Sequence, residues 1–593
     1  MRLHRIVGVL ATLIIAVAAT RADASAYKHF RAAIYITVGD TKKLANPATF
    51  AREFASVSSQ LDFDKVYIEA YRDRKFATDA ELESVKREFQ AKGIQTSGGI
   101  TLAAGGGGGQ FGTFDYENPS DRAECERAVR LIARHFDEVV LDDFFFYNSK
   151  SDADIAAKGA RSWTDYRIDR MREVSRDLVL GPAHQTNPRV RVIIKYPNWY
   201  EHFHGTGFDL AQEAQMFDGI YTGTETRDPE ITDQLLQQYE SYEIVRYFSN
   251  IRPGANLGAW VDTYDIRSID RYPEQLWGGL LAKAPEQTLF EWSAMASDKP
   301  APAGMRPWSK QATSFRWPVG AGRWASAANE ALHTIDGLLG QLGNPVGVAS
   351  YRPPHANGED FLHNYIGNLG VPIELYPEYP ASAHTILLTE AAASDPQIIG
   401  KIDASLRGGA NVIVTSGFLH ATQGRGFEQL AEWSVTGHVV AIDRYFDGFG
   451  AGAGKELKDA AKTQSVLFPQ VRFYTNDSWG IIRGVAAKKG FPVAVMDTYS
   501  KGTLYLWTMP ENFGDLYNLP QPLVTRIKQY LFADLPVQID APDHVALFTY
   551  DNGAFVVENY RDEAARVIIT RKGLAASETV SIPPHSFRLF AHS

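Results

Sequence analysis

Alternation of strand-like and helix-like segments, repeated eight times, restricts the fold of this sequence more than any other feature. The strand-like segments are AAIYITVGD, FDKVYIEAYRD, GIQTSGGITLA, EVVLDDFFF, RVRVIIKYPNW, FDGIYTGTETR, NLGAWVDTYD and QTLFEWSAM. Most precede a helical pattern such as TDAELESVKREFQAKG, with acidic residues at its start and glycine at its end. The 263 residues from Ala33 to Met295 match the roughly 250 of a closed (β/α)8 barrel. We favour this barrel over an open doubly wound sheet.

Polar side chains gather where the predicted strands end. In a barrel of this kind, the C-terminal ends of the strands form the floor of the active site. The polar and aromatic residues at those ends are Asp40, Glu69, Arg72, Asp142, Asp143, Lys195, Tyr196, Asn198, Thr222, Glu225, Arg227, Trp260, Asp262, Glu291 and Trp292. A barrel that served only as a scaffold would not need them, so we expect a functional site at this face.

Several carboxylates interleaved with flat aromatic rings are typical of a carbohydrate site. Cleavage of a glycosidic bond needs a protonated carboxylic acid and an ionised carboxylate, while aromatic rings stack on sugar faces. We predict that substrate contacts Glu69, Arg72, Lys195, Tyr196, Asn198, Trp260, Asp262, Glu291 and Trp292. Trp199 and Tyr200 are further candidate platforms, although core packing is an equal alternative for any single tryptophan.

The stretch EVVLDDFFFYN ends an apolar strand in two adjacent carboxylates, which repel each other and lose hydration beside aromatic rings. Alternation along a strand points Asp142 and Asp143 to opposite sides, so only one is expected to enter the pocket. We predict Asp143 as the nucleophile and Asp142 as its support, holding a loop or a sugar hydroxyl. Glu225 is the predicted general acid/base; its alternative is a salt bridge with Arg227.

No metal or cofactor is predicted. Asp142, Asp143 and Glu225 with His202 or His204 offer oxygen and nitrogen ligands in principle, but HFHG has no ligand spacing. The single cysteine, Cys125, excludes an internal disulfide and a zinc site built on several thiolates. The run GGGGG lacks the Lys-Ser/Thr of a phosphate loop, so we expect a flexible loop able to fold over substrate.

The N-terminus, MRLHRIVGVLATLIIAVAATRADASA, has the pattern of a secretory signal. Arg2 and Arg5 precede an apolar run that is shorter than the roughly 20 residues of a membrane span. We therefore expect residues 1–26 to be cleaved and the protein to be periplasmic or extracellular, with no membrane attachment. The formal net charge of -10 and the absence of a basic run argue against nucleic acid as a partner.

Three further segments follow the predicted barrel of residues 27–305. Residues 306–343 form an irregular linker and a helix, and residues 344–541 alternate strands and helices in a flavodoxin-like manner. Residues 542–593 alternate with period two around a DNG turn, which predicts a small β-sandwich.

The segment KIDASLRGGANVIVTSG, a helix, a Gly-Gly turn and a buried strand, resembles the amidotransferase-like domain that follows the barrel in family-42 β-galactosidases. An amidotransferase needs a nucleophilic cysteine after this strand, and the chain reads TSGFLHA instead. The resemblance therefore implies a structural domain, and we predict homo-oligomerisation through it. Barrel, amidotransferase-like domain and terminal β-domain, in this order, resemble glycoside hydrolases over the whole mature chain.

The resemblance has one important departure. Family-42 enzymes carry Asn-Glu as acid/base at the end of strand 4, where this chain has Asp142-Asp143. An aspartate after strand 4 with an acid after strand 6 is similar to the α-galactosidase clan in strand position, although that clan's Lys-x-Asp motif is absent. We predict an exported glycoside hydrolase; the alternatives are a non-catalytic glycan-binding protein and a polysaccharide lyase or deacetylase, for which Lys195, Tyr196 and Arg252 would serve.

Overall fold

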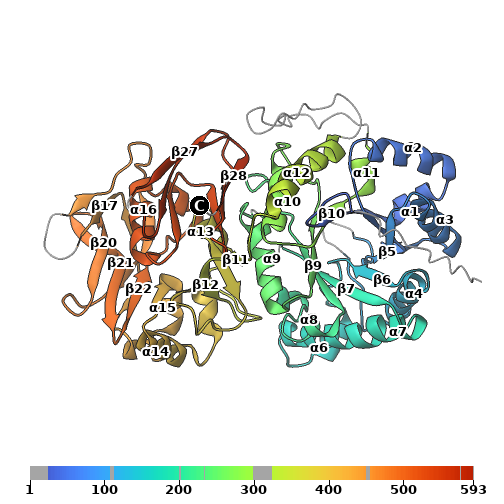
Figure 1. Cartoon of the computed structure of the whole chain (residues 1–593). Helices are drawn as coiled ribbons and strands as arrows, with labels where there is room; N and C mark the ends of the chain where they lie inside the picture. Colours follow the sequence, from blue (N-terminus) through green and yellow to red (C-terminus); the bar gives the residue numbers. More distant parts are fainter. Residues whose placement is uncertain are drawn as a thin grey trace, which may run out of the picture.

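The computed structural model describes residues 25–106, 112–198, 202–232, 234, 236–297, 323–448, 454–574 and 576–591 (Figure 1). The predicted signal sequence up to residue 24, the platforms Trp199 and Tyr200, most of the GGGGG run and residues 306–322 of the predicted linker lie outside the described residues. None of the described helices is long and apolar enough to cross a membrane.

The first part of the chain forms the predicted closed barrel of eight parallel strands. They are β1 (Arg31–Ile36), β2 (Lys65–Glu69), β5 (Gln95–Ile100), β6 (Glu138–Leu141), β7 (Arg191–Tyr196), β8 (Gly219–Gly223), β9 (Asn256–Val261) and β10 (Glu286–Phe290). Their order around the barrel follows the chain, and β1 pairs with β10 to close it. Six strands fall within the predicted segments, and β1 and β10 each begin one residue before theirs, so the fold prediction is confirmed.

Helices on the outside of the barrel bury the apolar stripes seen in the sequence. The longer ones are α2 (Pro47–Ser58), α3 (Asp79–Gln90), α4 (Pro119–His135), α6 (Trp163–Val174), α9 (Glu240–Ile251), α10 (Arg271–Leu281) and α12 (Arg323–Leu339). Helix α3 illustrates the local cause: Thr78 and Glu81 form a capping box at its start, while Leu82, Val85 and Phe89 face the core.

Large side chains fill the barrel interior, which leaves space only at its ends. Tyr35, Tyr67, Tyr221 and Trp260 form its central packing with smaller aliphatic residues. At the N-terminal ends of the strands, the Lys65 ammonium group lies 2.6 Å from Glu138 and 3.2 Å from Glu286. The polar residues predicted to form a site stand above this packing, at the C-terminal ends.

The middle part contains a nine-stranded mixed sheet. Five parallel strands lie in the order β13 (Ile373–Tyr376), β12 (Val348–Tyr351), β14 (Thr385–Leu388), β15 (Asn411–Thr415) and β22 (Gly502–Trp507), a flavodoxin-like order. Four antiparallel strands extend it: β21 (Lys489–Tyr499), β20 (Trp479–Ala486), β17 (Arg444–Asp447) and β18 (Lys455–Glu456). Beside them, β16 (Ser434–Ile442) pairs with β19 (Val466–Arg472). The sequence analysis predicted alternating strands and helices for residues 344–541 and did not predict this antiparallel extension.

The last part is a sandwich of two antiparallel sheets. One contains β24 (Val545–Tyr550), β25 (Phe555–Asn559) and β28 (Ser586–Phe590) with the short β11 (Pro345–Val346), and the other contains β23 (Val537–Asp540), β26 (Ala565–Arg571) and β27 (Glu578–Ile582). Strands β11 and β23 precede residue 542, so the sandwich takes in more of the chain than the predicted boundary allowed.

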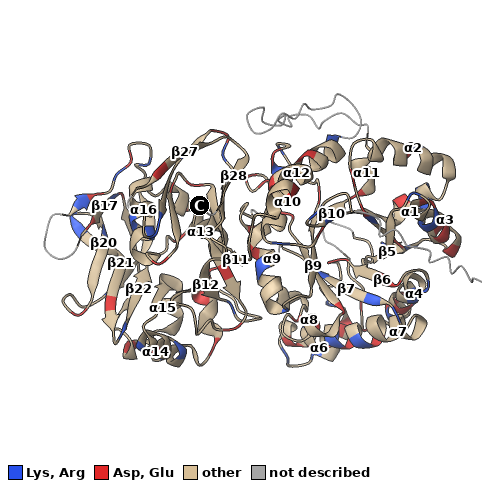
Figure 2. Cartoon of the chain, viewed as in Figure 1, with Lys and Arg blue, Asp and Glu red and all other residues tan. Residues whose placement is uncertain are grey.

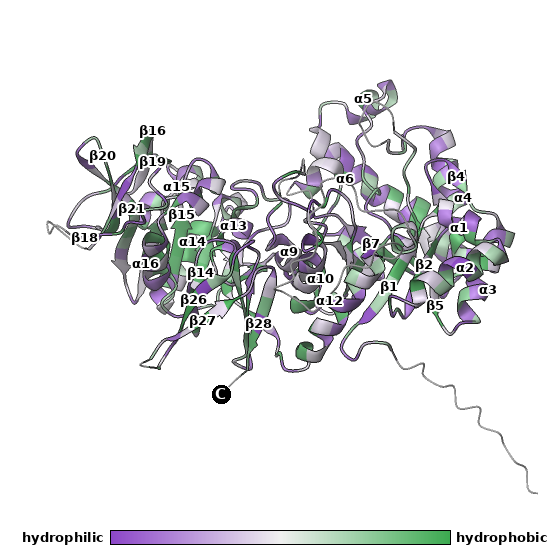
Figure 3. Ribbon diagram, turned by 90° about the horizontal axis from the view of Figure 1, so that it is seen from above, coloured by the Kyte–Doolittle hydropathy of each residue, from purple (hydrophilic) through white to green (hydrophobic). Residues whose placement is uncertain are grey.

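The three parts pack against one another through buried contacts. The ring of Tyr239 stacks on Phe548 with centroids 5.5 Å apart, and Arg246 forms an ion pair of 2.6 Å with Glu374. Apolar residues concentrate in the central strands of the barrel and of the nine-stranded sheet (Figure 3). Acidic and basic residues alternate over the visible elements without forming a basic stripe (Figure 2).

Candidate active site

A cavity of about 580 Å³ opens at the C-terminal ends of the barrel strands. The predicted site residues that line it are Arg72, Asp142, Asp143, Glu225, Trp260 and Asp262. They come from the C-terminal ends of β2, β6, β8 and β9 or from the residues that follow these strands. These positions are far apart in the sequence. The barrel therefore brings six of the predicted site residues to one hollow.

Lys195 is the centre of the carboxylate cluster. Its ammonium nitrogen Nζ donates to Asp143 Oδ2 at 2.6 Å, to Glu225 Oε1 at 3.1 Å and to Asp142 Oδ1 at 3.4 Å. The nitrogen also lies 4.5 Å from the centroid of the Trp260 ring, in cation–π contact. Its side chain is 3% exposed, and the neighbouring carboxylates hold its pKa above the usual range despite burial. Lys195 is thus a buried, permanently charged bridge.

Asp142 is the ionised member of the cluster. It accepts hydrogen bonds from Arg72 Nη2 at 2.9 Å, from Thr101 Oγ1 at 3.1 Å and from the backbone N–H of Asp143 at 2.9 Å. Burial alone would raise its pKa, but the charges of Lys195 and Arg72 outweigh burial and lower the pKa below the usual value. Both carboxylate oxygens are already engaged by the protein.

Asp142 and Asp143 both line the cavity, so the expectation that only one could enter it is wrong. Strand β6 ends at Leu141, and the backbone N–H of Phe145 donates to the carbonyl of Asp142 at 3.2 Å. The chain turns at this point, and the strict alternation of a strand no longer applies. The two aspartates can therefore share Lys195 as a partner.

Asp143 and Glu225 form a close pair of carboxyl groups. Because Lys195 Nζ lies 2.6 Å from Asp143 Oδ2 and 3.1 Å from Glu225 Oε1, these oxygens are at most 5.7 Å apart, the sum of the two distances. Retaining glycosidases hold their two carboxyl groups about 5–5.5 Å apart, and inverting ones about 6.5–9.5 Å. The separation fits the retaining geometry.

Burial raises the pKa of both members of this pair. Burial, opposed by Lys195 and reinforced by Asp142 and Glu225, raises the pKa of Asp143 to about 8. Burial also raises the pKa of Glu225, with Lys195 again opposing it. A single ammonium group cannot neutralise several buried carboxylates, so the pair retains a proton near neutral pH.

Only one of the two Glu225 carboxyl oxygens has a hydrogen-bond partner among the described residues. Oε1 accepts from Lys195, whereas Oε2 is buried without a hydrogen-bond partner in the described part of the protein. The predicted alternative, a salt bridge with Arg227, is replaced by a different pairing, because Arg227 donates to both oxygens of Asp262 at 3.2 and 2.7 Å. Arg227 fixes Asp262, and Glu225 keeps a free oxygen.

Glu69 supports the site instead of lining it. It is fully buried and accepts from Tyr35 Oη at 2.7 Å, from the Val38 N–H at 2.6 Å and from Arg72 Nε at 3.0 Å. Arg72 in turn reaches Asp142, so Glu69 orients the arginine that orients the carboxylate.

Tyr196 and Trp292, both predicted to bind substrate, belong to the core. Tyr196 points out of the barrel, where its ring stacks on Phe248 of α9 at 4.9 Å. The Trp292 ring is fully buried, and its indole N–H donates to Glu53 at 3.1 Å. For Trp292, core packing was the correct alternative; for Tyr196, the sequence analysis had not considered it.

Glu291 and Asn198, two other predicted contacts, do not line the cavity either. Glu291 accepts from Ser293 Oγ at 2.8 Å. Asn198 is buried, and its side-chain oxygen and nitrogen have no hydrogen-bond partner among the described residues.

Several residues that line the cavity were missed by the sequence analysis: Asp73, Phe144, Gln234, Tyr264, Asp265 and Phe290. Tyr264 is 46% exposed, and the Asp262 carboxylate holds its backbone N–H at 3.0 Å. It lies in the predicted segment NLGAWVDTYD, two residues beyond Asp262. An aromatic residue just past a polar strand end was the signal that would have found it.

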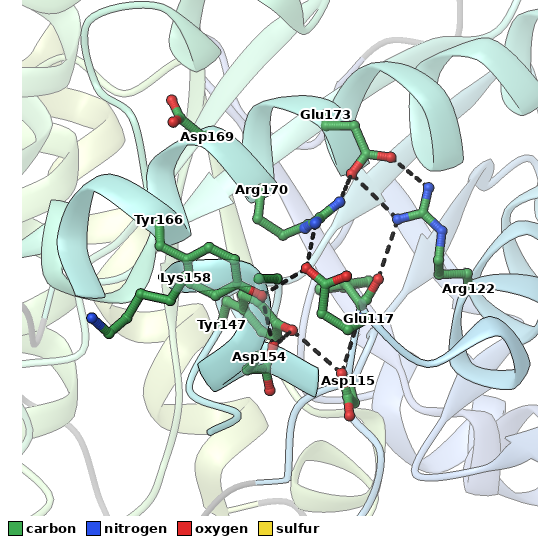
Figure 4. Close-up of polar contacts among 12 residues, drawn as sticks. Asp115, Glu117, Arg122, Tyr147, Asp154, Lys158, Tyr166, Asp169, Arg170 and Glu173 are labelled. Carbon is green, nitrogen blue, oxygen red and sulfur yellow. Dashed lines mark hydrogen bonds and ion pairs between the residues drawn. The ribbon is translucent and has the colours of Figure 1, made fainter. Parts of the chain in front are cut away.

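A buried network fixes the loop that follows Asp143 (Figure 4). Tyr147 donates to Asp154, and the Tyr166 hydroxyl, which has one proton to donate, lies 2.8 Å from a carboxylate oxygen of Asp154 and 2.8 Å from one of Glu117. Glu117 accepts from Arg170, which pairs with Glu173, and Glu173 is bound by Arg122 of α4. The network connects the loop that follows Asp143 to helices α4 and α6.

No group of three or more His, Cys, Asp and Glu side chains in the described ranges is arranged to hold a metal ion. Asp142, Asp143 and Glu225 surround an ammonium group instead. His202 contacts Asn357 and Asp360 of the middle part, at 2.5 Å each.

Residues 19–341, more than half of the chain, match the family described as "Probable glycosyl hydrolase, catalytic domain". The chain belongs to this family. Residues 343–512 match "Uncharacterized protein SSO3021, second domain", and residues 536–578 match "Probable glycosyl hydrolase, C-terminal domain". These matches confirm the prediction of a glycoside hydrolase.

A curated relative and three solved structures are similar to this probable glycosyl hydrolase. Uncharacterized protein SSO3021 of Saccharolobus solfataricus is 26% identical over 297 residues, 44% of this chain and 49% of the relative, so the match spans about half the relative's length. The beta-galactosidase from Bacillus circulans sp. alkalophilus has a TM-score of 0.62 at 10% identity, covering 95% of this chain and 99% of that one.

A GH42 beta-galactosidase from G. stearothermophilus, in a catalytic-mutant form, has a TM-score of 0.61 at 11% identity, covering 95% and 99% of the two chains. Alpha-L-fucosidase isoenzyme 2 from Paenibacillus thiaminolyticus has a TM-score of 0.59 at 9% identity, covering 94% and 98%. At these identities the likeness shows the fold, including the predicted family-42-like architecture.

Proposed function

We propose that this protein is an exported, retaining glycoside hydrolase in which Asp143 is the acid/base and Glu225 the nucleophile. The observation that carries the proposal is the Asp143–Glu225 pair, with oxygens at most 5.7 Å apart and joined by one buried lysine. A retaining mechanism needs two carboxyl groups at about this spacing, one protonated and one ionised.

The electrostatics favour these roles over the reverse assignment made from the sequence. A pKa of about 8 keeps Asp143 protonated at neutral pH, as a general acid must be. Asp143 also stands at the end of the fourth barrel strand, the position of the acid/base in the family-42 resemblance. Glu225 lines the cavity, and its Oε2 accepts no hydrogen bond among the described residues.

The reaction then follows in two steps. Asp143 protonates the leaving oxygen while Glu225 Oε2 bonds to the anomeric carbon, giving a glycosyl-enzyme ester. Asp143, now ionised, removes a proton from water, whose oxygen attacks the anomeric carbon and releases Glu225. Lys195 stabilises whichever of the two carboxyl groups carries negative charge at each stage.

Azide rescue tests the pair and its roles. Glu225→Gly and Asp143→Gly are assayed on 2,4-dinitrophenyl glycosides of common hexoses in both anomeric forms, with and without sodium azide. Azide should give a product of opposite anomeric configuration with Glu225→Gly and of unchanged configuration with Asp143→Gly. Exchanged configurations would reverse the roles, and wild-type turnover in both variants would exclude the pair.

Asp265→Asn is the matched control, since Asp265 lines the same cavity outside the pair. Its turnover should stay within a few-fold of wild type. Substrate contacts are proposed for Arg72, Trp260 and Asp262, and Tyr264 offers an aromatic face at the mouth. A non-catalytic glycan-binding role gives no reason to bury a carboxyl pair with raised pKa, so we rank it second.

Two further parts of the proposal concern the whole protein. Export rests on the N-terminal segment of charged, apolar and small residues, and fractionation of expressing cells with N-terminal sequencing tests it. Self-association through residues 344–541 remains a prediction, motivated by a domain without a visible catalytic residue. Light scattering of the mature chain at micromolar concentration tests it, and a monomer would contradict it.

A further inference from the structure

A second cavity, of about 490 Å³, lies in the antiparallel extension of the middle sheet. It is lined by residues of the β19–β20 connection and of strands β20 and β21, among them Phe473, Thr475, Asn476, Trp479, Arg483 and Phe491. Figures 1 and 3 place these strands at the end of the molecule remote from the barrel. The cavity is therefore separate from the candidate active site.

Glycines and an irregular strand pairing create the hollow. The register between β20 and β21 shifts twice between Gly480 and Arg483, which interrupts the regular surface of the sheet. A Cβ atom at Gly480 would meet the ring of Phe473 at 3.5 Å, so the ring packs directly on the strand backbone. Gly490 also lines the cavity without a side chain.

Aromatic side chains at this cavity remain open to solvent. Trp479 is 37% exposed, and Tyr474, next to the lining residue Phe473, is 54% exposed. Exposure of large aromatic surface forgoes the roughly 25 cal/mol per Å² that burial contributes. Clusters of exposed apolar surface in a hollow mark binding sites more often than chance.

Polar groups stand beside these rings. Asn476 carries an amide with both donors and an acceptor, Thr475 a hydroxyl, and Arg483 a guanidinium group. A pyranose ring has one apolar C–H face and a rim of hydroxyls, so it matches a flat ring bordered by amide, hydroxyl and guanidinium groups. A purely apolar protein partner would offer the exposed Thr475 and Asn476 side chains no hydrogen-bond partner.

We propose that this cavity is a second glycan-binding site, which takes pyranose units of a polysaccharide with Trp479 as the stacking platform and Asn476 and Arg483 as hydroxyl ligands. The choice of a polysaccharide rests on the proposed glycosidase function. Such a site retains a polymer chain on the protein while the barrel cleaves it. Loss of this site should weaken the binding of polymers and leave the hydrolysis of small aryl glycosides unchanged.

Affinity electrophoresis of the full mature chain tests this proposal. Native gels contain xyloglucan, galactan, galactomannan, arabinogalactan or mixed-linkage β-glucan. Wild type should be retarded by at least one of them, and Trp479→Ala and Asn476→Ala should weaken that retardation at least fivefold. Leu574→Ala, which removes an exposed apolar side chain of the terminal sandwich, should behave as wild type.

The outcomes separate this proposal from the proposed function. Equal retardation of Trp479→Ala and wild type, or no retardation of wild type by any of the five polymers, overturns the glycan site. If Trp479→Ala changed the oligomeric state in light scattering and left the retardation unchanged, the cavity would be a contact between copies of this chain. That result would also overturn the proposed glycan site. Weaker retardation with no hydrolysis of any aryl glycoside would support the site and count against the glycosidase.

Discussion

Lys195→Met should disable the active site by uncoupling its three carboxyl groups. The ammonium nitrogen lies 2.6, 3.1 and 3.4 Å from oxygens of Asp143, Glu225 and Asp142. At an effective dielectric constant of about 20, a unit charge about 3 Å away contributes on the order of 5 kcal/mol per pair. Much of this will be recovered by proton uptake and water entry, and because Lys195 lowers the pKa of Glu225, we expect that pKa to rise further in the variant.

The direction of the pH effects follows from the raised pKa values. A carboxyl group whose folded pKa exceeds its unfolded value supports stability below the unfolded pKa, and this contribution is lost as pH rises through the folded pKa. For Asp143, this contribution to stability is lost between about pH 3.8, the ordinary pKa, and about pH 8, the pKa in the folded protein. In Lys195→Met, the loss of stability should continue to higher pH. The acidic limb of the kcat/KM profile should shift to higher pH, together with the pKa of Glu225.

The assay compares kcat/KM against pH and urea unfolding at pH 5 and 8 for Lys195→Met and a matched control. Lys65→Met is that control, because Lys65 is another buried lysine paired with two glutamates, Glu138 and Glu286, at the opposite end of the barrel. Both variants should lose about 3–5 kcal/mol of stability. An unshifted pH profile in Lys195→Met, or an equal shift in Lys65→Met, would refute the reasoning.

Three further predictions test the surroundings of the pair. Gly223→Ala should cut kcat at least tenfold with fold retained by circular dichroism, because its Cβ would lie 2.6 Å from Glu225 Oε2. Asp154→Ala should lower the unfolding free energy by about 2–4 kcal/mol and lower kcat, since it removes the buried carboxylate that accepts from Tyr147 and lies 2.8 Å from the Tyr166 hydroxyl. Asp152→Ala, at an exposed position of the same helix, should do neither when measured by the same denaturation. Tyr264→Ala should raise KM for oligosaccharides several-fold and spare aryl glycosides, as steady-state kinetics would show.

The barrel was predictable because each of its strands carries its own local signal. A buried parallel strand is a short apolar run, and its C-terminal end is marked by polar residues, as in VVLDD and VIIKYPN. Eight such runs, each separated from the next by a helical pattern, are compatible with few folds other than the closed barrel. The antiparallel strands of the middle part lacked this signal, since a strand such as β16 has only one fully buried residue, Ile442.

The orientation of single side chains was less predictable than the fold. Tyr196 and Trp292 were assigned to the site by their position near strand ends, but their direction depends on which neighbours pack beside them, Phe248 and Glu53, both distant in sequence. The same limit applies to Asp142, whose direction is decided by the turn after Leu141. Strand alternation predicts direction only while the strand continues.

The roles of the two catalytic candidates depend on the same kind of distant information. In the sequence, Asp143 and Glu225 are simply two carboxylates after two strands, and either could hold the proton. The structure places Asp142 and Glu225 beside Asp143 and buries all three around one shared ammonium group. Burial, reinforced by the two neighbouring carboxyl groups and only partly opposed by Lys195, raises the pKa of Asp143 to about 8. Arg72, held by Glu69, stabilises the charge of Asp142 from the other side. The proton is therefore assigned by a balance of buried charges from four strands, which no local pattern encodes, and this balance is why we propose Asp143 as the acid.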